Sequence, residues 1–183
     1  MARIYTKTGD DGSTGLLFGG RVSKGGELVS ATGDVDEAIS VLGVARAGCA
    51  NAERASLLLQ VQRELFVVAA DLAVNPDHRD RLRPGVSLVV PEMVADLEQL
   101  IDGLTVKRPL RPVFLVPGST ATEAAIDLAR TVVRRAERHA VRARVAGHAV
   151  SDNALYYLNR LSDLLFVLAR HAAEGVEEPV SHD

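Results

Sequence analysis

Residues 120–146 constrain the fold of this chain more than any other segment. They read TATEAAIDLARTVVRRAERHAVRARVA and contain no glycine or proline, so we expect one helix of about seven turns. Thr120 and Glu123 have the spacing of a capping box, in which the hydroxyl and the carboxylate each accept an otherwise unpaired N–H. At about 100° per residue, one side of this helix is apolar and is expected to face a core. That side carries Ala121, Ala125, Leu128, Val132 and Ala136.

The opposite side of the same helix mixes carboxylates with guanidinium groups. It carries Glu123, Asp127, Arg130, Arg134, Glu137 and Arg138. One interpretation is a solvated face with ion pairs four residues apart. The other is an anion site, because arginines four residues apart form a column about 12 Å long whose forks can each bind two oxygens of a polyphosphate. The carboxylates would then orient the forks or hold a metal. Spacing alone leaves both interpretations open.

Composition favours a helical fold and limits the classes of partner. Hydrophobic residues make up 47% of the 183 residues, but only 4% are aromatic and tryptophan is absent, which predicts an aliphatic, alanine-rich core of close-packed helices in a single domain. The net charge of −3 provides no general attraction to nucleic acid or to an anionic membrane. One cysteine, Cys49, excludes an internal disulfide. With no membrane-length apolar run and no signal-peptide core, we expect a cytoplasmic protein.

The first 33 residues differ from the remainder because glycine and hydroxyl residues replace the helical pattern. Residues 6–15 (TKTGDDGSTG) would allow backbone N–H groups to converge on an anion, with Lys7 and Lys24 as cations, although a flexible tail has the same composition. Residues 15–22 are not a Walker A loop, because Arg21 stands where lysine is required. We therefore expect an N-terminal arm that either binds an anion or is flexible.

The rest of the chain predicts an all-α fold, a five-helix bundle. The expected helices are residues 34–48, 52–74, 91–104, 120–146 and one capped by Ser151 or Asp152 that runs to about residue 175. Residues 77–90 are expected to be irregular, 113–116 to be a short extended segment, and 176–183 to be a frayed tail. The predicted organisation is one domain, residues 1–183, with an arm (1–33), a helical bundle (34–175) and the tail.

Six segments, in this order and spacing, resemble one protein family. They are IYTKTGDDGSTGL, GGRVSK, VDE, FLVPGS, ARTVVRRAER and YLNRLSDLLFVLAR. The chain is similar to the PduO-type ATP:cob(I)alamin adenosyltransferases over nearly its whole length. It departs from the common pattern at Ala38-Ile39, where the family has Leu-Asn, and at Ser119, where it has glycine. The resemblance implies a ferritin-like five-helix bundle that assembles as a homotrimer with active sites between subunits.

The resemblance also implies the reaction and its residues. ATP, with Mg²⁺, would donate its 5′-deoxyadenosyl group to cob(I)alamin, giving adenosylcobalamin and triphosphate. The residues implied to bind ATP are Thr6, Lys7, Thr8, Gly9, Thr14, Gly15, Lys24, Arg134, Arg135, Glu137, Arg138 and Asn159. Lys7, Arg130, Arg134 and Asp36 would be catalytic, with Arg130 pairing with Asp36 of a neighbouring subunit. Phe114 would lie beneath the corrin ring, and Glu137 is a possible Mg²⁺ contact.

Other functions remain open from the residues themselves. The same bundle could use ATP with a different acceptor, or it could be a non-catalytic carrier of nucleotide or corrinoid. A helical nucleic-acid module is disfavoured by the net charge and by the carboxylates among the arginines. A cobalamin reductase and an adenosylcobalamin-dependent enzyme are the expected protein partners of an adenosyltransferase, and no membrane partner is expected.

Overall fold

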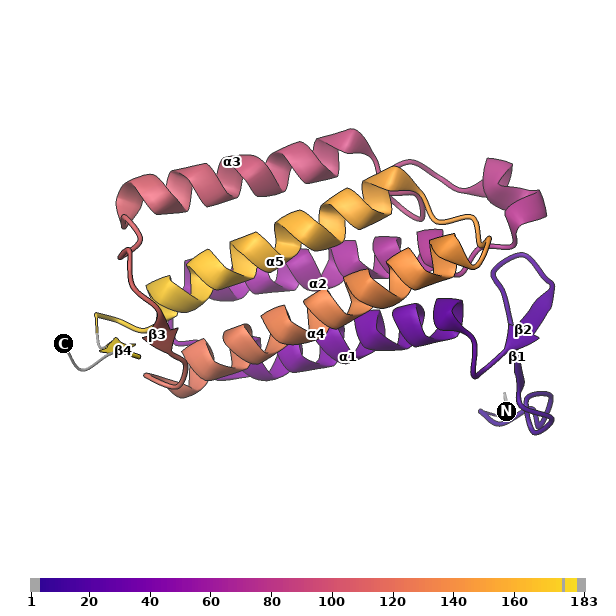
Figure 1. The fold of residues 1–183 in the computed structure, drawn as a ribbon, viewed down its shortest axis with the longest axis horizontal. Helices are drawn as coiled ribbons and strands as arrows, with labels where there is room; N and C mark the ends of the chain where they lie inside the picture. The colour runs from indigo at the N-terminus through magenta and orange to yellow at the C-terminus, as the bar shows by residue number, and fades with distance from the viewer. Residues whose placement is uncertain (1–3, 176, 181–183) are drawn as a thin grey trace.

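The computed structural model describes residues 4–175 and 177–180 and forms the predicted bundle of five α-helices (Figure 1). The helices are α1 (Glu27–Ala47), α2 (Ala52–Leu72), α3 (Pro91–Lys107), α4 (Ala121–Val145) and α5 (Asp152–Ala172), with a short 3₁₀ helix, η1 (Pro76–Arg81), after α2. Helix α4 packs between α1 and α5, α2 packs on α1, and α3 lies on the outside against α5. None of the helices within the described ranges is both long and apolar enough to cross a membrane.

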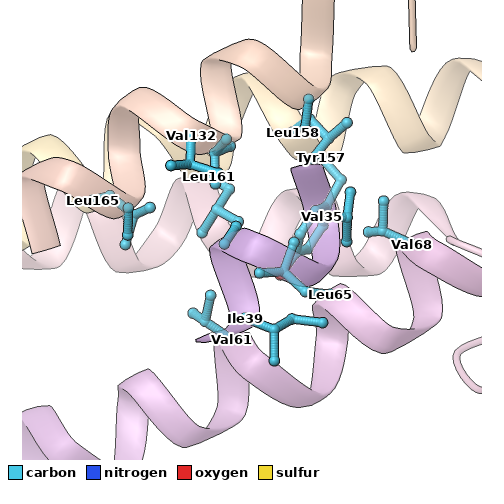
Figure 2. Close-up of a cluster of buried hydrophobic side chains, with 14 of the residues drawn as sticks. Val35, Ile39, Val61, Leu65, Val68, Val132, Tyr157, Leu158, Leu161 and Leu165 are labelled. Atoms are coloured by element: carbon cyan, nitrogen blue, oxygen red, sulfur yellow. The ribbon is translucent and has the colours of Figure 1, made fainter. Parts of the chain in front are cut away.

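The core is aliphatic and rich in alanine, as composition predicted. Figure 2 shows side chains of α1, α2, α4 and α5 converging in its centre, among them Val35, Leu65, Val132 and Leu161, all buried. Helix α4 buries alanines along its length, and alanines of α1 are buried as well. Small side chains allow the axes of two helices to approach closely, which explains why α1 and α4 form the most extensive pairing in the bundle.

Helix α1 begins seven residues earlier than the sequence pattern predicted. It starts at Glu27, after Gly26, and runs through Gly33, which we had assigned to the arm. Leu28, Ala31 and Val35 are buried on one face, so tertiary packing outweighs the cost of about 1 kcal/mol for a glycine in a helix. The N-terminal arm therefore ends at Gly26.

The predicted inward face of α4 is partly wrong. Leu128 is 54% exposed, whereas Glu123 and Asp127, which we placed on the polar side, are 0% and 5% exposed. Arg170 of α5 causes this rotation, because its Nη2 lies 2.5 Å from Glu123 Oε1 and 4.0 Å from Asp127 Oδ1. Two buried carboxylates are tolerated only beside such a cation.

The predicted capping box at the start of α4 is half formed. Thr120 Oγ1 accepts the N–H of Glu123 at 3.0 Å, as expected. The carboxylate of Glu123 instead accepts the N–H groups of Gly118 and Ser119, at 2.6 and 3.0 Å. Glu123 thus holds the loop before α4 rather than the cap itself.

Two small antiparallel sheets lie at opposite ends of the bundle (Figure 1). In the arm, β1 (Ser13–Gly15) pairs with β2 (Arg21–Ser23), with Thr14 opposite Val22. At the other end, β3 (Leu115–Val116) pairs with β4 (Glu178–Pro179). The extended segment is therefore confirmed at residues 115–116, but the tail is not frayed at residues 178–179; its residues 176 and 181–183 lie outside the described ranges. The predicted irregular segment contains η1 at its start.

Candidate functional site

The arm folds into a cradle with a cavity of about 290 Å³. The cavity is lined by Thr6, Lys7, Thr8, Gly9, Asp10, Ser13, Thr14, Gly15, Arg21 and Lys24. All seven arm residues predicted to bind ATP therefore lie around one hollow, with Asp10, Ser13 and Arg21 added to them. Both cations of the prediction are present, so the hollow suits an anionic ligand.

Arg21 and Lys24 hold the cradle in shape. The guanidinium of Arg21 donates to Ser13 Oγ at 2.8 Å and to the carbonyl oxygen of Thr8 at 2.5 Å. Lys24 Nζ donates to the carbonyl oxygen of Gly9 at 2.8 Å. The side chain and N–H of Ser13 both donate to Asp11, and these bonds, more than the charge of Arg21, lower the pKa of the Asp11 carboxyl. The sequence prediction rejected Arg21 as a Walker lysine and assigned it no other role.

The three arginines of the predicted column lie along α4 in different surroundings. Arg134 and Arg138 are exposed. Arg130 is half-buried and its Nε donates to Asp127 Oδ1 at 2.8 Å, within the same helix. Asp36 is exposed on α1 with no side-chain partner in the part of the chain that the structure describes. The pairing of Arg130 with Asp36 of another subunit stays a prediction.

Arg135, also predicted to bind ATP, points toward α1 instead of joining the column. Its Nε donates to Asp34 Oδ1 at 3.0 Å and it also pairs with Glu37. The hydrogen bond to Asp34 is the main cause of the raised pKa of Arg135. His139 Nδ1 lies 2.7 Å from the other Asp34 oxygen. Arg135 therefore joins two helices, and its guanidinium is already occupied by carboxylates.

Asn159 of α5 and Glu137 of α4, both predicted at the ATP site, are in direct contact. Asn159 Nδ2 donates to Glu137 Oε1 at 3.1 Å. Among the described residues there is no group of three or more His, Cys, Asp or Glu side chains that could hold a metal ion. Magnesium in nucleotide sites often uses one or two carboxylates and completes its shell with phosphate oxygens and water. A single carboxylate at Glu137 fits that pattern.

A pocket of about 480 Å³ lies where the segment before α4 meets α4 and α5. It is lined by Arg111, Pro112, Val113, Phe114, Leu115, Pro117, Asp127, Arg130, Phe166 and Arg170. The ring of Phe114 is 88% exposed, so it stands free at the pocket. The sequence prediction missed Phe166, although a large apolar residue outside the buried stripe of α5 is the signal that could have found it.

Arg130 connects this pocket with the arginine column. It lines the pocket, and Arg134 and Arg138 follow at intervals of four residues along the exposed side of α4. The arm cradle lies at the other end of the bundle from the segment that carries Phe114 (Figure 1). The molecule therefore separates a hollow with cationic side chains from an aromatic pocket, and a line of arginines starts at the pocket.

Comparisons of the sequence and of the structure with known proteins point to the same family. Residues 4–172 match the family model described as cobalamin adenosyltransferase. The chain is 42% identical to a corrinoid adenosyltransferase of Citrobacter freundii, over 93% of this chain and 94% of the relative. It is 41% identical to a corrinoid adenosyltransferase of Mycobacterium tuberculosis H37Rv, over 94% of this chain and 89% of the relative.

The structural likeness extends over the whole molecule. A variant PduO-type ATP:corrinoid adenosyltransferase from Lactobacillus reuteri, complexed with cobalamin and ATP, superimposes with a TM-score of 0.88 at 30% identity, covering 99% of this chain and 100% of that one. A second variant of that enzyme, complexed with ATP, gives a TM-score of 0.84 at 31% identity over 97% of this chain and 100% of that one. The chain belongs to the cobalamin adenosyltransferase family.

Proposed function

We propose that this protein transfers the 5′-deoxyadenosyl group of ATP to cob(I)alamin, forming adenosylcobalamin and triphosphate. It is a corrinoid adenosyltransferase, and its substrates are ATP and the reduced corrinoid. One observation carries the proposal: the arginine column of α4 begins at a pocket lined by Phe114 and Phe166, so a polyphosphate bound along the column would adjoin an aromatic surface. No observation favours a different acceptor or a non-catalytic carrier.

In this reaction the protein has to position ATP against cob(I)alamin and to stabilise the charge on the triphosphate leaving group. The lone pair of cobalt(I) attacks C5′ of the ribose, a cobalt–carbon bond forms, and the C5′–O bond breaks as its electrons leave with triphosphate. Because cobalt(I) is itself a strong nucleophile, the protein supplies no general base. The developing charge on the leaving group needs preorganised cations. Arg134 is suited to this role because it is exposed with no competing ion pair among the described residues, and Lys7 is suited to it at the arm cradle.

The remaining residues of the proposed ATP site hold the nucleotide. The arm residues Thr6, Thr8, Gly9, Thr14, Gly15 and Lys24 would surround the phosphates, and Arg138, Glu137 and Asn159 would complete the site from the bundle. Mg²⁺ would be held by Glu137 together with phosphate oxygens, where it would neutralise part of the triphosphate charge. Arg135 is better described as a residue that positions α1 against α4.

Phe114 would lie against the lower face of the corrin ring. Phe114 is an exposed aromatic residue lining the pocket, and its apolar ring would keep water away from the cobalt of a corrinoid bound there. A cobalt(II) centre without a lower ligand is easier to reduce, because that ligand raises the energy of the orbital that accepts the electron. Phe166 is on the same pocket wall and would contact the same substrate.

The finer features of the proposal concern assembly and partners. We propose a homotrimer with sites between subunits, supplied with reduced corrinoid by a reductase and delivering its product to an adenosylcobalamin-dependent enzyme. The arm strands β1 and β2 lie at the opposite end of the bundle from β3, next to Phe114, and this separation supports shared sites (Figure 1). A cytoplasmic location stays a prediction, consistent with the single cysteine.

An anaerobic spectroscopic assay tests the function. Purified protein is mixed with chemically reduced cobalamin and Mg²⁺-ATP, and the visible bands of cobalt(I) are followed as adenosylcobalamin forms. Conversion that requires both protein and ATP, with triphosphate released intact, is the expected result. ATP binding without conversion would point to another acceptor, and absence of both would refute the phosphate site.

A further inference from the structure

Four polar side chains form a continuous chain of contacts across α3, α5 and α4. Arg160 Nε donates to Glu98 Oε1 at 2.8 Å, and Arg160 Nη1 donates to Asn159 Oδ1 at 2.6 Å. Asn159 Nδ2 then donates to Glu137 Oε1 at 3.1 Å. Asn159 and Glu137 belong to the proposed ATP site, whereas Arg160 and Glu98 have no role in it. Helix α3, which carries none of the proposed site residues, is thereby linked to the proposed ATP site.

The two charged neighbours of Asn159 determine which way its amide points. A guanidinium only donates hydrogen bonds and an ionised carboxylate only accepts them, whereas an amide has one accepting and one donating end. Only one orientation satisfies both neighbours: Oδ1 toward Arg160 and Nδ2 toward Glu137. The flipped amide would place donor against donor and acceptor against acceptor. Arg160 therefore selects the orientation from one side, and Glu137 from the other.

This orientation determines what the site offers to a nucleotide. Asn159 retains its second Nδ2 hydrogen, and Glu137 Oε2 accepts no hydrogen bond from the part of the chain that the structure describes. Without Arg160, Glu137 alone would hold the amide of Asn159, and the Oδ1 end of that amide would have no partner among the described residues. Arg160 is itself held in place, because its Nε is bound to Glu98 on α3.

We propose that Arg160, held by Glu98, is a positioning residue for ATP: it fixes the amide of Asn159 and, through it, the carboxylate of Glu137. The inference rests on the proposed function, since it concerns the ATP site of that reaction. Arg160 does not itself contact the reacting atoms. The side chains of Arg160 and Glu98 are 40% and 50% exposed, so replacing either leaves the core intact.

The first test is the ATP dependence of Arg160→Met, a change that keeps much of the length and removes every donor. We expect the KM for ATP to rise about tenfold, in the range for losing a hydrogen bond to a charged group. The KM for cob(I)alamin and the thermal midpoint should stay at the wild-type values. Arg160→Lys should raise the ATP KM as well, because a single ammonium cannot reproduce the planar fork that bridges Glu98 and Asn159.

The matched control is Arg144→Met. Arg144 has a similar exposure, 38%, and also carries one ion pair, to Asp152 at 2.8 Å. This variant should keep the wild-type KM for ATP. A rise in the control equal to that of Arg160→Met would overturn the proposal, because any exposed ion pair would then have the same effect.

A double-mutant cycle separates positioning from a general structural role. In the background of Asn159→Ala, the further change Arg160→Met should alter the ATP KM by less than about twofold, because the amide that it orients is gone. If the two substitutions instead raise the ATP KM independently, so that the double variant shows the product of the two single increases, the proposal is refuted. Wild-type protein that fails to convert cob(I)alamin would refute the proposed function, whereas active wild type with an unchanged ATP KM in Arg160→Met would refute only the positioning role.

Discussion

At the scale of single residues, Arg134 is the clearest test of the phosphate site. It is exposed on α4, and its guanidinium makes no hydrogen bond or ion pair within the described chain; only its carbonyl oxygen accepts from Arg138. Arg134→Ala should therefore leave the bundle folded while lowering kcat about 10²-fold or more, the range for removing a group that stabilises transition-state charge. Single-turnover conversion of cob(I)alamin measures the loss. Arg142→Ala, an exposed arginine farther along the same helix, is the control and should be fully active. Normal turnover by Arg134→Ala would defeat the assignment.

His171, at the end of α5, makes stability depend on pH. Burial lowers the pKa of its ring from 6.5, and the charges of Arg108 and Arg54 act in the same direction, against the hydrogen bond to the carbonyl oxygen of Leu104. The folded state then binds a proton less readily than the unfolded state, so His171 costs no stability above pH 6.5 and stability falls as pH drops below it. Urea denaturation between pH 7 and pH 5 should show a weaker pH dependence in His171→Gln. If the free energy of unfolding changes equally with pH in the wild type and in His171→Gln, His171 does not contribute to the pH dependence of stability.

At the scale of elements, periodicity predicted the bounds of α2 to α5 to within a few residues. It failed to predict which side chains are buried where that depends on a residue distant in the sequence. Glu123 and Asp127 belong to a polar face by their spacing, yet they are buried because Arg170, far along the chain on α5, lies beside them. No local pattern contains that information. Similarly, spacing left two interpretations of the arginine column and composition left two of the arm, and family resemblance was needed to choose between them. Arg160 was not found because its proposed role depends on a contact with α3.

Asp71 joins three elements and is the strongest candidate for a stability determinant. It is fully buried; its oxygens accept from Arg79 of η1 at 2.6 Å, from the N–H of Val89 at 3.0 Å and from Ser151, the N-cap of α5, at 3.0 Å. Asp71→Ala leaves these donors without an acceptor, so we expect a loss of about 3–5 kcal/mol in the free energy of unfolding. Chemical denaturation measures it. Asp80→Ala, an exposed carboxylate on η1, should change stability by less than about 0.5 kcal/mol. A loss below about 1 kcal/mol for Asp71→Ala would show that the hydrogen bonds accepted by Asp71 do not determine the stability of the fold.

At the scale of the whole molecule, the two halves of the proposed site lie toward opposite ends of one chain. Strands β1 and β2 of the arm lie at one end of the bundle, and β3, which follows Phe114 in the chain, lies at the other (Figure 1). Arg130 lines the Phe114 pocket, and α4 continues from it to Val145, about 22 Å farther along the helix toward the arm. Because cobalt must reach C5′ of the bound ATP, the arm that covers a given nucleotide should come from a different copy than the pocket that holds the corrinoid.

Mixed oligomers test this arrangement directly. Lys7→Ala disables the arm and Arg130→Ala disables the pocket side of α4, so each variant alone should be nearly inactive. If arm and pocket meet between subunits, co-refolding the two variants in equal amounts leaves about a quarter of the sites with both residues intact, because each site draws its two parts from separate chains at random. Turnover should then recover to about a quarter of the wild-type rate, in a species whose mass by light scattering equals that of the wild-type oligomer. Refolding each variant alone is the control for recovery during handling. If every site were built from one chain, every mixed oligomer would carry only singly disabled sites, and the mixture would stay as inactive as its components.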